Sequence, residues 1–236
     1  GVNNGTFNGS TGTVRMTGGG ASISGSGTHN FSNLTIAATN VTAASSITVA
    51  GNLASVAPGT FTQATGGTLT MSGASKSITG TGFIFDNLAI AGSISVPVDV
   101  AVAGNLVVNG SINGAGGAVT MTGTTKTISG AGTITFGTLV ADGNITTTSS
   151  FSISNSLDVS GNLTATAGTV TFSGSSFLNG NANLYNVTLS GTSLQLSSNA
   201  VLGIAGSYTV SSGSLNVTAS VPNTVNFNGT GAQTIP

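Results

Sequence analysis

The segment NLAIAGSI at residues 87–94 recurs eighteen positions later as NLVVNGSI at residues 105–112. In both copies apolar residues alternate with small or polar ones, so on a β-strand the apolar side chains would share one face. Copies of one strand at so short a spacing are typical of a chain that winds back over itself. The segment therefore predicts the coils of a β-solenoid.

A triplet of apolar, polar and apolar residues marks a longer period, of about fifty residues. Counted from Met16, successive copies lie 55, 50, 51 and 55 residues apart, and we expect about three coils in each period. Each triplet is a piece of half-buried strand. The five copies are Val14-Arg15-Met16, Leu69-Thr70-Met71, Val119-Thr120-Met121, Val170-Thr171-Phe172 and Val225-Asn226-Phe227.

The triplets divide the chain, residues 1–236, into a single repeat array. Residues 1–12 are the tail of a partial repeat and residues 224–236 the head of another. The full repeats are expected at 13–67, 68–117, 118–168 and 169–223.

The composition predicts an all-β fold with essentially no helix, because Gly, Ser, Thr, Asn and Val dominate. The favoured architecture is a parallel β-helix. We expect one strand over residues 96–102, with Pro97 at a coil corner or on an unpaired edge. Six Asn-Gly pairs supply positive φ at turns, and they keep an antiparallel β-sandwich with strand exchange as the alternative.

Both ends of the array have the sequence of interior coils rather than of polar caps. Two explanations remain open at this point: the array continues beyond residues 1–236, or subunits stack end to end. In the second case the assembly junction is formed by the apolar residues of the partial repeats. These are Phe7, Val14, Met16, Val225, Phe227 and Ile235.

The repeat unit resembles those of a known class of proteins. Residues 225–235, with the Asn-Leu and Gly-Asn-Leu strands that follow in complete copies, are similar to the repeats of long secreted bacterial surface proteins. More loosely, they resemble β-helical adhesins of the filamentous haemagglutinin type and autotransporter passengers. The resemblance covers nearly the whole chain and implies an extracellular location at the cell surface, with a structural or adhesive role.

Charge is scarce in this chain. Only 3% of the residues are Asp, Glu, Lys or Arg, and the net charge is −1. Three dispersed cations cannot bind nucleic acid, and no apolar run approaches the roughly 18 residues of a membrane-spanning helix. A surface this neutral lacks the repulsion that keeps monomers apart, so self-association is expected. The absence of Cys excludes disulfides.

We expect no catalytic residue, cofactor or metal. His29 is the single histidine and is expected at a corner or facing solvent, since no nucleophile motif accompanies it. The four carboxylates are expected to be solvated and too far apart for a paired acid–base site. They are Asp86, Asp99, Asp142 and Asp158.

The leading hypothesis is a structural subunit of an extracellular filament, sheath or surface layer, which assembles with other copies of the chain through end-to-end or edge contacts. The second is an adhesin stalk or glycan-binding module, with cell-surface or matrix glycans as partners, and eleven Asn-x-Ser/Thr sequons also allow glycosylation. The third is ice binding by an outward ladder of Thr70, Thr120 and Thr171.

Overall fold

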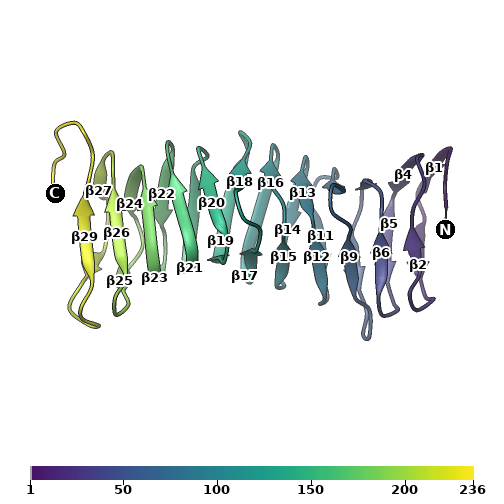
Figure 1. The fold of residues 1–236 in the computed structure, drawn as a ribbon, viewed down its shortest axis with the longest axis horizontal. Helices are drawn as coiled ribbons and strands as arrows, with labels where there is room; N and C mark the ends of the chain where they lie inside the picture. The colour runs from purple at the N-terminus through teal and green to yellow at the C-terminus, as the bar shows by residue number, and fades with distance from the viewer. Residues whose placement is uncertain (1) are drawn as a thin grey trace.

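The computed structural model describes residues 2–236 as an elongated parallel β-solenoid of about 12 coils, without helix among these residues. The two ends of the chain lie at opposite ends of the rod (Figure 1). Strands pair in parallel with the strands of the neighbouring coils, so the solenoid prediction is confirmed and the antiparallel alternative is wrong. Within residues 2–236 no helix is long and apolar enough to cross a membrane. Gly1, the first residue of the expected partial repeat 1–12, lies outside the described residues.

Each coil contributes one strand to each of three faces, which we number in the order in which the chain crosses them. Face 1 consists of β1 (Thr6–Asn8), β4 (Thr28–Phe31), β7 (Ile47–Val49), β10 (Thr68–Met71), β13 (Asn87–Ile90), β16 (Leu106–Val108), β18 (Lys126–Ser129), β20 (Asn144–Thr147), the last parts of β21 (Phe151–Ala165) and β23 (Ser175–Leu184), β26 (Val201–Ile204) and β29 (Thr224–Phe227).

Faces 2 and 3 are built in the same way. Face 2 consists of β2 (Thr13–Met16), β5 (Asn33–Ile36), β8 (Leu53–Ser55), β11 (Lys76–Thr79), β14 (Ser93–Ser95), the first parts of β17 (Ser111–Met121), β19 (Thr133–Ala141) and β21, then β22 (Thr169–Phe172), β24 (Asn186–Leu189) and β27 (Tyr208–Val210). Face 3 consists of β3 (Ser22–Ile23), β6 (Val41–Ala43), β9 (Phe61–Gln63), β12 (Phe83–Phe85), β15 (Val100–Val102), the second parts of β17, β19 and β21, the start of β23, β25 (Ser193–Leu196) and β28 (Ser214–Asn216).

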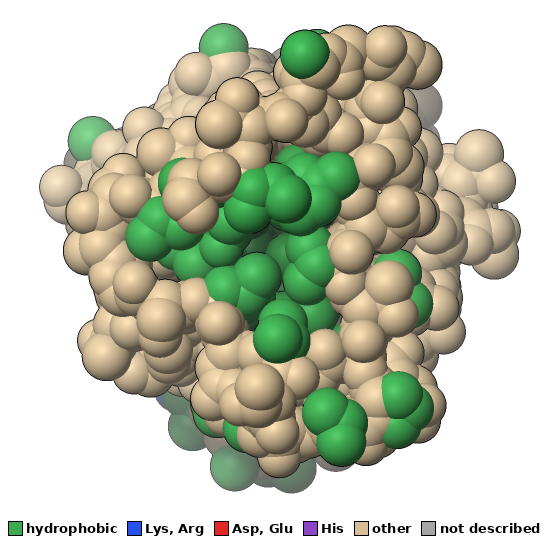
Figure 2. Space-filling model, turned by 90° about the vertical axis from the view of Figure 1, so that its left-hand side faces the viewer, with side chains coloured by type: hydrophobic (Ala, Val, Ile, Leu, Met, Phe, Trp, Pro, Cys, Tyr) green, Lys and Arg blue, Asp and Glu red, His purple; other side chains and the backbone are tan. Residues whose placement is uncertain are grey.

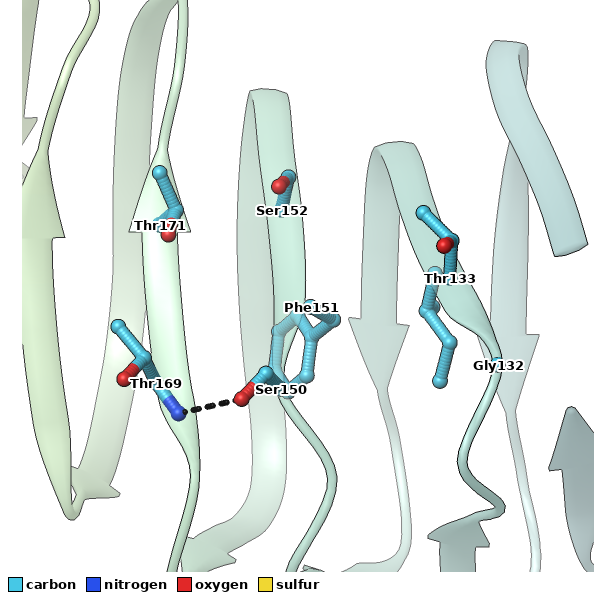
Figure 3. Close-up of a pocket in the computed structure, with 8 residues that line it drawn as sticks. Gly132, Thr133, Ser150, Phe151, Ser152, Thr169 and Thr171 are labelled. Atoms are coloured by element: carbon cyan, nitrogen blue, oxygen red, sulfur yellow. Dashed lines mark hydrogen bonds between the residues drawn. The ribbon is translucent and has the colours of Figure 1, made fainter. Parts of the chain in front are cut away.

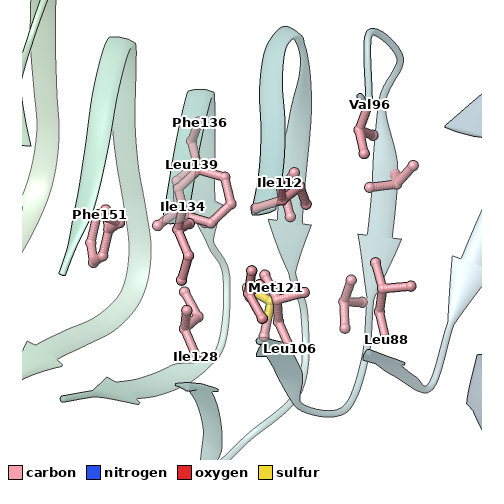
Figure 4. Close-up of a cluster of buried hydrophobic side chains, with 14 of the residues drawn as sticks. Leu88, Val96, Leu106, Ile112, Met121, Ile128, Ile134, Phe136, Leu139 and Phe151 are labelled. Carbon is pink, nitrogen blue, oxygen red and sulfur yellow. The ribbon is translucent and has the colours of Figure 1, made fainter. Parts of the chain in front are cut away.

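Inward side chains of all three faces meet in one apolar core that runs from Ile23 to Ile204. Like residues stack along it: Leu88 pairs with Leu106, as their eighteen-residue spacing predicts, and Leu106 pairs with Ile128 (Figure 4). The coil length varies from 17 residues, between Phe83 and Val100, to 25, between Leu53 and Ile78. The core therefore keeps its register while the corners absorb insertions.

The fifty-residue repeat contains eight strand segments, as in β2 to β9, when each long strand is divided at its corners. At three strands per coil this is two and two-thirds coils, within one strand of the expected three. The five triplets consequently fall on faces 2, 1, 3, 2 and 1, in β2, β10, β17, β22 and β29. Thr70, Thr120 and Thr171 lie on three different faces and form no ladder.

Pro97 lies between β14 and β15, where the chain turns from face 2 to face 3, as predicted. The expected strand over residues 96–102 is wrong in its first half, because only Val100–Val102 is a strand. Proline cannot donate a backbone hydrogen bond to the neighbouring coil, so the ladder stops there.

Most Asn-Gly pairs do not supply positive φ, contrary to expectation. Of their six glycines only Gly180 has it, at φ 82. At Gly110 the requirement is space instead: a Cβ would lie 1.9 Å from the carbonyl oxygen of Gly92 in the preceding coil. Close stacking of the coils likewise requires glycine at Gly180 and Gly229, whereas a Cβ at Gly5 or Gly114 would make only ordinary contacts.

The Asn-Leu and Gly-Asn-Leu motifs are joined by a corner hydrogen bond. The side-chain oxygen Oδ1 of Asn87 accepts the backbone N–H of Asn105 at 2.9 Å, and Asn33 does the same for Asn52. A Cβ at Gly104 would lie 2.5 Å from Oδ1 of Asn87, so the glycine makes room for the bond. The recurring motif is thus a link between successive coils.

We predict that Asn87→Ala lowers the free energy of unfolding by about 1–3 kcal/mol, since it removes a side chain that bonds to Asn105, Gly67 and Asp86. Asn144→Ala is the matched control, because the exposed side chain of Asn144 in β20 makes no hydrogen bond to the described part of the chain. Chemical denaturation followed by circular dichroism measures both. Equal effects of the two substitutions would contradict the proposed role of the corner bond.

Candidate functional site

The two ends of the solenoid leave strand edges unpaired. Strands β1, β2 and β3 pair only with β4, β5 and β6, and at the other end β27, β28 and β29 pair only with β24, β25 and β26. Every face therefore presents a row of backbone N–H and C=O groups at each end of the described structure. Such rows are templates for pairing with a further strand.

Apolar side chains lie open at the end that carries β1. Phe7 is 37% exposed, and its ring lies 5.2 Å from that of Phe31, between centroids. Val14 and Met16 are half-buried against the core. Together with Val2, Asn3, Ile23 and His29 these residues line a cavity of about 240 Å³, which we call the N-terminal pocket.

The opposite end also exposes the core. Figure 2 views this end and shows an apolar patch at its centre, surrounded by backbone and by side chains of other types. Val225 and Phe227 of β29 are half-buried there, and the rings of Tyr208 and Phe227 meet edge to face at 5.9 Å between centroids. Burial raises the pKa of the Tyr208 phenol, so this group stays neutral at physiological pH.

Five of the six predicted junction residues lie in the end coils. The sixth does not continue the pattern: Ile235 lies outside any strand and is 68% exposed, although its counterparts Ile23 and Ile78 are buried. In the described structure no coil follows to cover it. Gln233 holds the same segment in place by donating to the carbonyls of Ile204 and Gly206.

The position of His29 was not predicted from the sequence. It was expected at a corner or in solvent, but it is 4% exposed and points inward from β4, in register with Phe7. Its Nε2 lies 3.1 Å from the carbonyl oxygen of Ser24, and its Nδ1 is buried without a partner. Phe31 could have indicated the inward direction of His29, because residues two positions apart on a strand lie on the same face and an apolar residue is expected to face the core.

The four aspartates bind neighbouring corners and hydroxyls. Asp86 accepts the N–H of Gly66 at 2.7 Å, and Asp99 accepts that of Ala118 at 2.8 Å. Asp142 and Asp158 accept serine hydroxyls. Among residues 2–236 no three His, Cys, Asp or Glu side chains come together in a group that could hold a metal ion.

A second candidate surface runs along face 2 over seven coils, from β14 to β27. Two outward positions per coil give fourteen side chains, and all are Ser, Thr or Asn; we call this surface the hydroxyl face. Its residues are Ser93, Ser95, Ser111, Asn113, Thr133, Thr135, Ser150, Ser152, Thr169, Thr171, Asn186, Thr188, Ser207 and Thr209.

The hydroxyl face contains a shallow trough of about 250 Å³, drawn in Figure 3. The side chains of Thr133, Ser152 and Thr171 line it, above the buried Phe151. One serine is already engaged, because Oγ of Ser150 accepts the N–H of Thr169 at 3.0 Å. Within residues 2–236 the hydroxyls of Thr133, Ser152 and Thr171 make no hydrogen bond, which leaves them available to a ligand.

Comparison of the chain with protein-family models, with curated proteins and with solved structures finds no match.

Proposed function

We propose that this protein is a structural subunit of an extracellular filament, sheath or surface layer, and that copies join end to end. The observation that carries the proposal is the apolar centre and the three strand edges at each end of the described structure. Burying such a surface is favourable by roughly 25 cal/mol for each Å² of apolar area.

The proposed contact repeats one that the molecule already makes. Each interior coil joins its neighbour through three parallel strand pairs around a layer of core side chains. In a junction between copies aligned along the rod, β1 would pair with β29, so that strands of face 1 meet. Face 1 has twelve strands and faces 2 and 3 have eleven each, so the space of one strand remains between β2 and β27 and between β3 and β28. A second copy thereby supplies the missing partner of the end strands on face 1.

Charge favours the same contact. Arg15 is the only Asp, Glu, Lys or Arg before Lys76, and none follows Asp158. Arg15 is exposed on β2 and points away from the core. No repulsion between like charges therefore opposes the approach of one end to the other.

We predict that the purified chain forms rods that lengthen with concentration, as measured by sedimentation and electron microscopy. Phe7→Lys and Val225→Lys each place a charge on one end and should block elongation, because a buried unpaired charge costs several kcal/mol. Mixing the two variants should give dimers joined by the intact ends. Thr120→Lys, on an outward position of an interior coil, is the matched control and should still form rods.

Concentration-independent monomers of folded wild-type chain would contradict end-to-end assembly. Rods from either end variant alone would show that the copies associate through other surfaces.

The hydroxyl face supports a second candidate function, binding of an ordered, hydroxyl-rich polysaccharide, as in an adhesin stalk. The strands set its rows about 4.8 Å apart along the rod, and outward residues of one strand follow at about 6.6 Å. A regular ligand can meet this array with many weak hydrogen bonds at once. The same regularity suits ice, the third function considered.

We predict that Thr171→Lys together with Ser152→Lys reduces binding to crystalline polysaccharide at least tenfold in a pull-down titration, because the lysines stand above the trough. Thr70→Lys together with Thr48→Lys, on face 1, is the matched control and should bind normally. Thermal hysteresis without polysaccharide binding would assign the hydroxyl face to ice instead.

A further inference from the structure

Residues 233–236 come after β29 at the end where an aligned junction leaves the space of one strand on face 2. In the rest of the rod every strand of face 1 is followed along the chain by a strand of face 2, as β10 is by β11. The segment after β29 holds the same place in this order, although it is not a strand in the described structure. It is therefore a candidate for the missing strand of face 2.

The interior corner before β11 shows how such a strand begins. A Cβ at Gly73 would lie 1.8 Å from the carbonyl oxygen of Ala50 and 2.9 Å from Cγ of Lys76. Two residues after Lys76, Ile78 is buried and pairs with Leu53 of the preceding coil. The corner before β18 repeats this arrangement with Gly123, Ala103, Lys126, Ile128 and Leu106.

The corner after β29 has the same geometry. A Cβ at Gly229 would lie 2.1 Å from the carbonyl oxygen of Ala205 and 2.9 Å from Cδ of Gln233. Two residues after Gln233, Ile235 holds the place of the buried isoleucine, and three residues after Ala205, Tyr208 holds the place of the leucine. The interior corners thus predict that Ile235 pairs with Tyr208 of β27.

This register places Gln233 beside Gly206, and the two residues are already in contact. Nε2 of Gln233 donates to the carbonyl oxygen of Gly206 at 2.7 Å, and its Oε1 accepts the N–H of Gly229 at 2.9 Å. These bonds hold the start of the segment at the edge of β27, next to the space on face 2. Ile235 is 68% exposed because no strand of the described structure lies on its other side.

We propose that residues 233–235 become a strand of face 2 when two copies join, between β27 of their own chain and β2 of the second copy. This inference rests on the proposed assembly. In the junction Ile235 contacts Val14 of the second copy and leaves water, so its apolar area stabilises the contact. The strand ends at Ile235, because Pro236 has no N–H to donate to a neighbouring strand.

The same alignment accounts for the space on face 3. Val2 precedes β1 and forms a parallel bridge to Ser24, which follows β3. In the junction Val2 of the second copy therefore enters the space between β3 of its own chain and β28 of the first copy. Both spaces are thus entered by residues that flank the paired strands of face 1.

The experiment introduces pairs of cysteines into a chain that has none. The proposed register lines up three outward residues of face 2, in the order Ser207, Thr234 and Thr13 of the second copy. Within one chain Thr13 and Thr234 lie at opposite ends of the rod, so a disulfide between these positions must join two copies.

The double variant Thr13→Cys with Thr234→Cys places the two thiols on adjacent strands, about 4.8 Å apart and within reach of a disulfide. The matched control, Thr13→Cys with Ser207→Cys, places them two strands apart, at about 9.6 Å, which is out of reach. We expect oxidation of the first variant to give a ladder of covalent oligomers on a denaturing gel. The control should run as a monomer.

The association constant provides a second measurement. Ile235→Lys should weaken association at least tenfold in sedimentation equilibrium, because a lysine buried without a partner is strongly disfavoured. Ile84→Lys is the matched control, since Ile84 faces outward from the interior strand β12 and is 46% exposed. It should associate like the wild type, and circular dichroism confirms that both variants are folded.

The outcomes separate this inference from the proposal on which it rests. A covalent ladder only from the variant with Ser207→Cys would show that β2 pairs directly with β27, which overturns the inference and leaves end-to-end assembly standing. Rods that form from both cysteine variants without any disulfide, or undiminished association of Ile235→Lys, would also overturn it. No association of the wild type would overturn the assembly itself, and the inference with it.

Discussion

The close stacking of one coil on the next is the constraint on which the rest of this structure depends. Parallel strands lie about 4.8 Å apart, and the corners must hold the same spacing. At Gly73 and Gly123 a Cβ would lie within 2 Å of a carbonyl oxygen of the preceding coil, at 1.8 and 1.9 Å. Glycine at the corners, and not only alternation on the strands, lets the ladders continue on three faces.

The eight-strand repeat distributes its motifs around the rod. Within a repeat the triplet and the two motifs that follow lie directly above one another, as Leu69, Leu88 and Leu106 do on face 1. The eight strands of a repeat are one fewer than the nine strands of three full coils. The triplet of the next repeat therefore lies one face earlier. The seven strands under the hydroxyl face therefore come from seven different positions of the repeat, so no single repeated motif produces this surface.

The hydroxyl face differs from the other two faces, where polar residues at outward positions are interrupted by apolar ones. Face 1 carries Ala89 and Val107 at outward positions, and face 3 carries Ile84, which is 46% exposed, and Val140. All three faces draw on the same repeats, yet only face 2 keeps Ser, Thr or Asn at both outward positions over seven coils. The difference lies in the choice of residues along one face.

The sequence allowed the coil and the core to be predicted but not the faces. Leu88 and Leu106 are recognisable from their spacing, because alternation and period both survive in the text of the chain. The face on which each triplet lies is not predictable from the sequence. Strands β17, β19 and β21 run through their corners without a break, so the strands of a repeat cannot be counted from the sequence. His29 shows the same limit, since one histidine between polar neighbours does not reveal which way its strand faces.

The end surfaces and the hydroxyl face lie on different parts of the rod, so one molecule can use both. If copies join end to end with their faces aligned, each added subunit places a further hydroxyl face on the same line, beyond its own face 2 strands β2, β5, β8 and β11. Many weak contacts to one ordered ligand then act together, and the strength of attachment rises steeply with rod length.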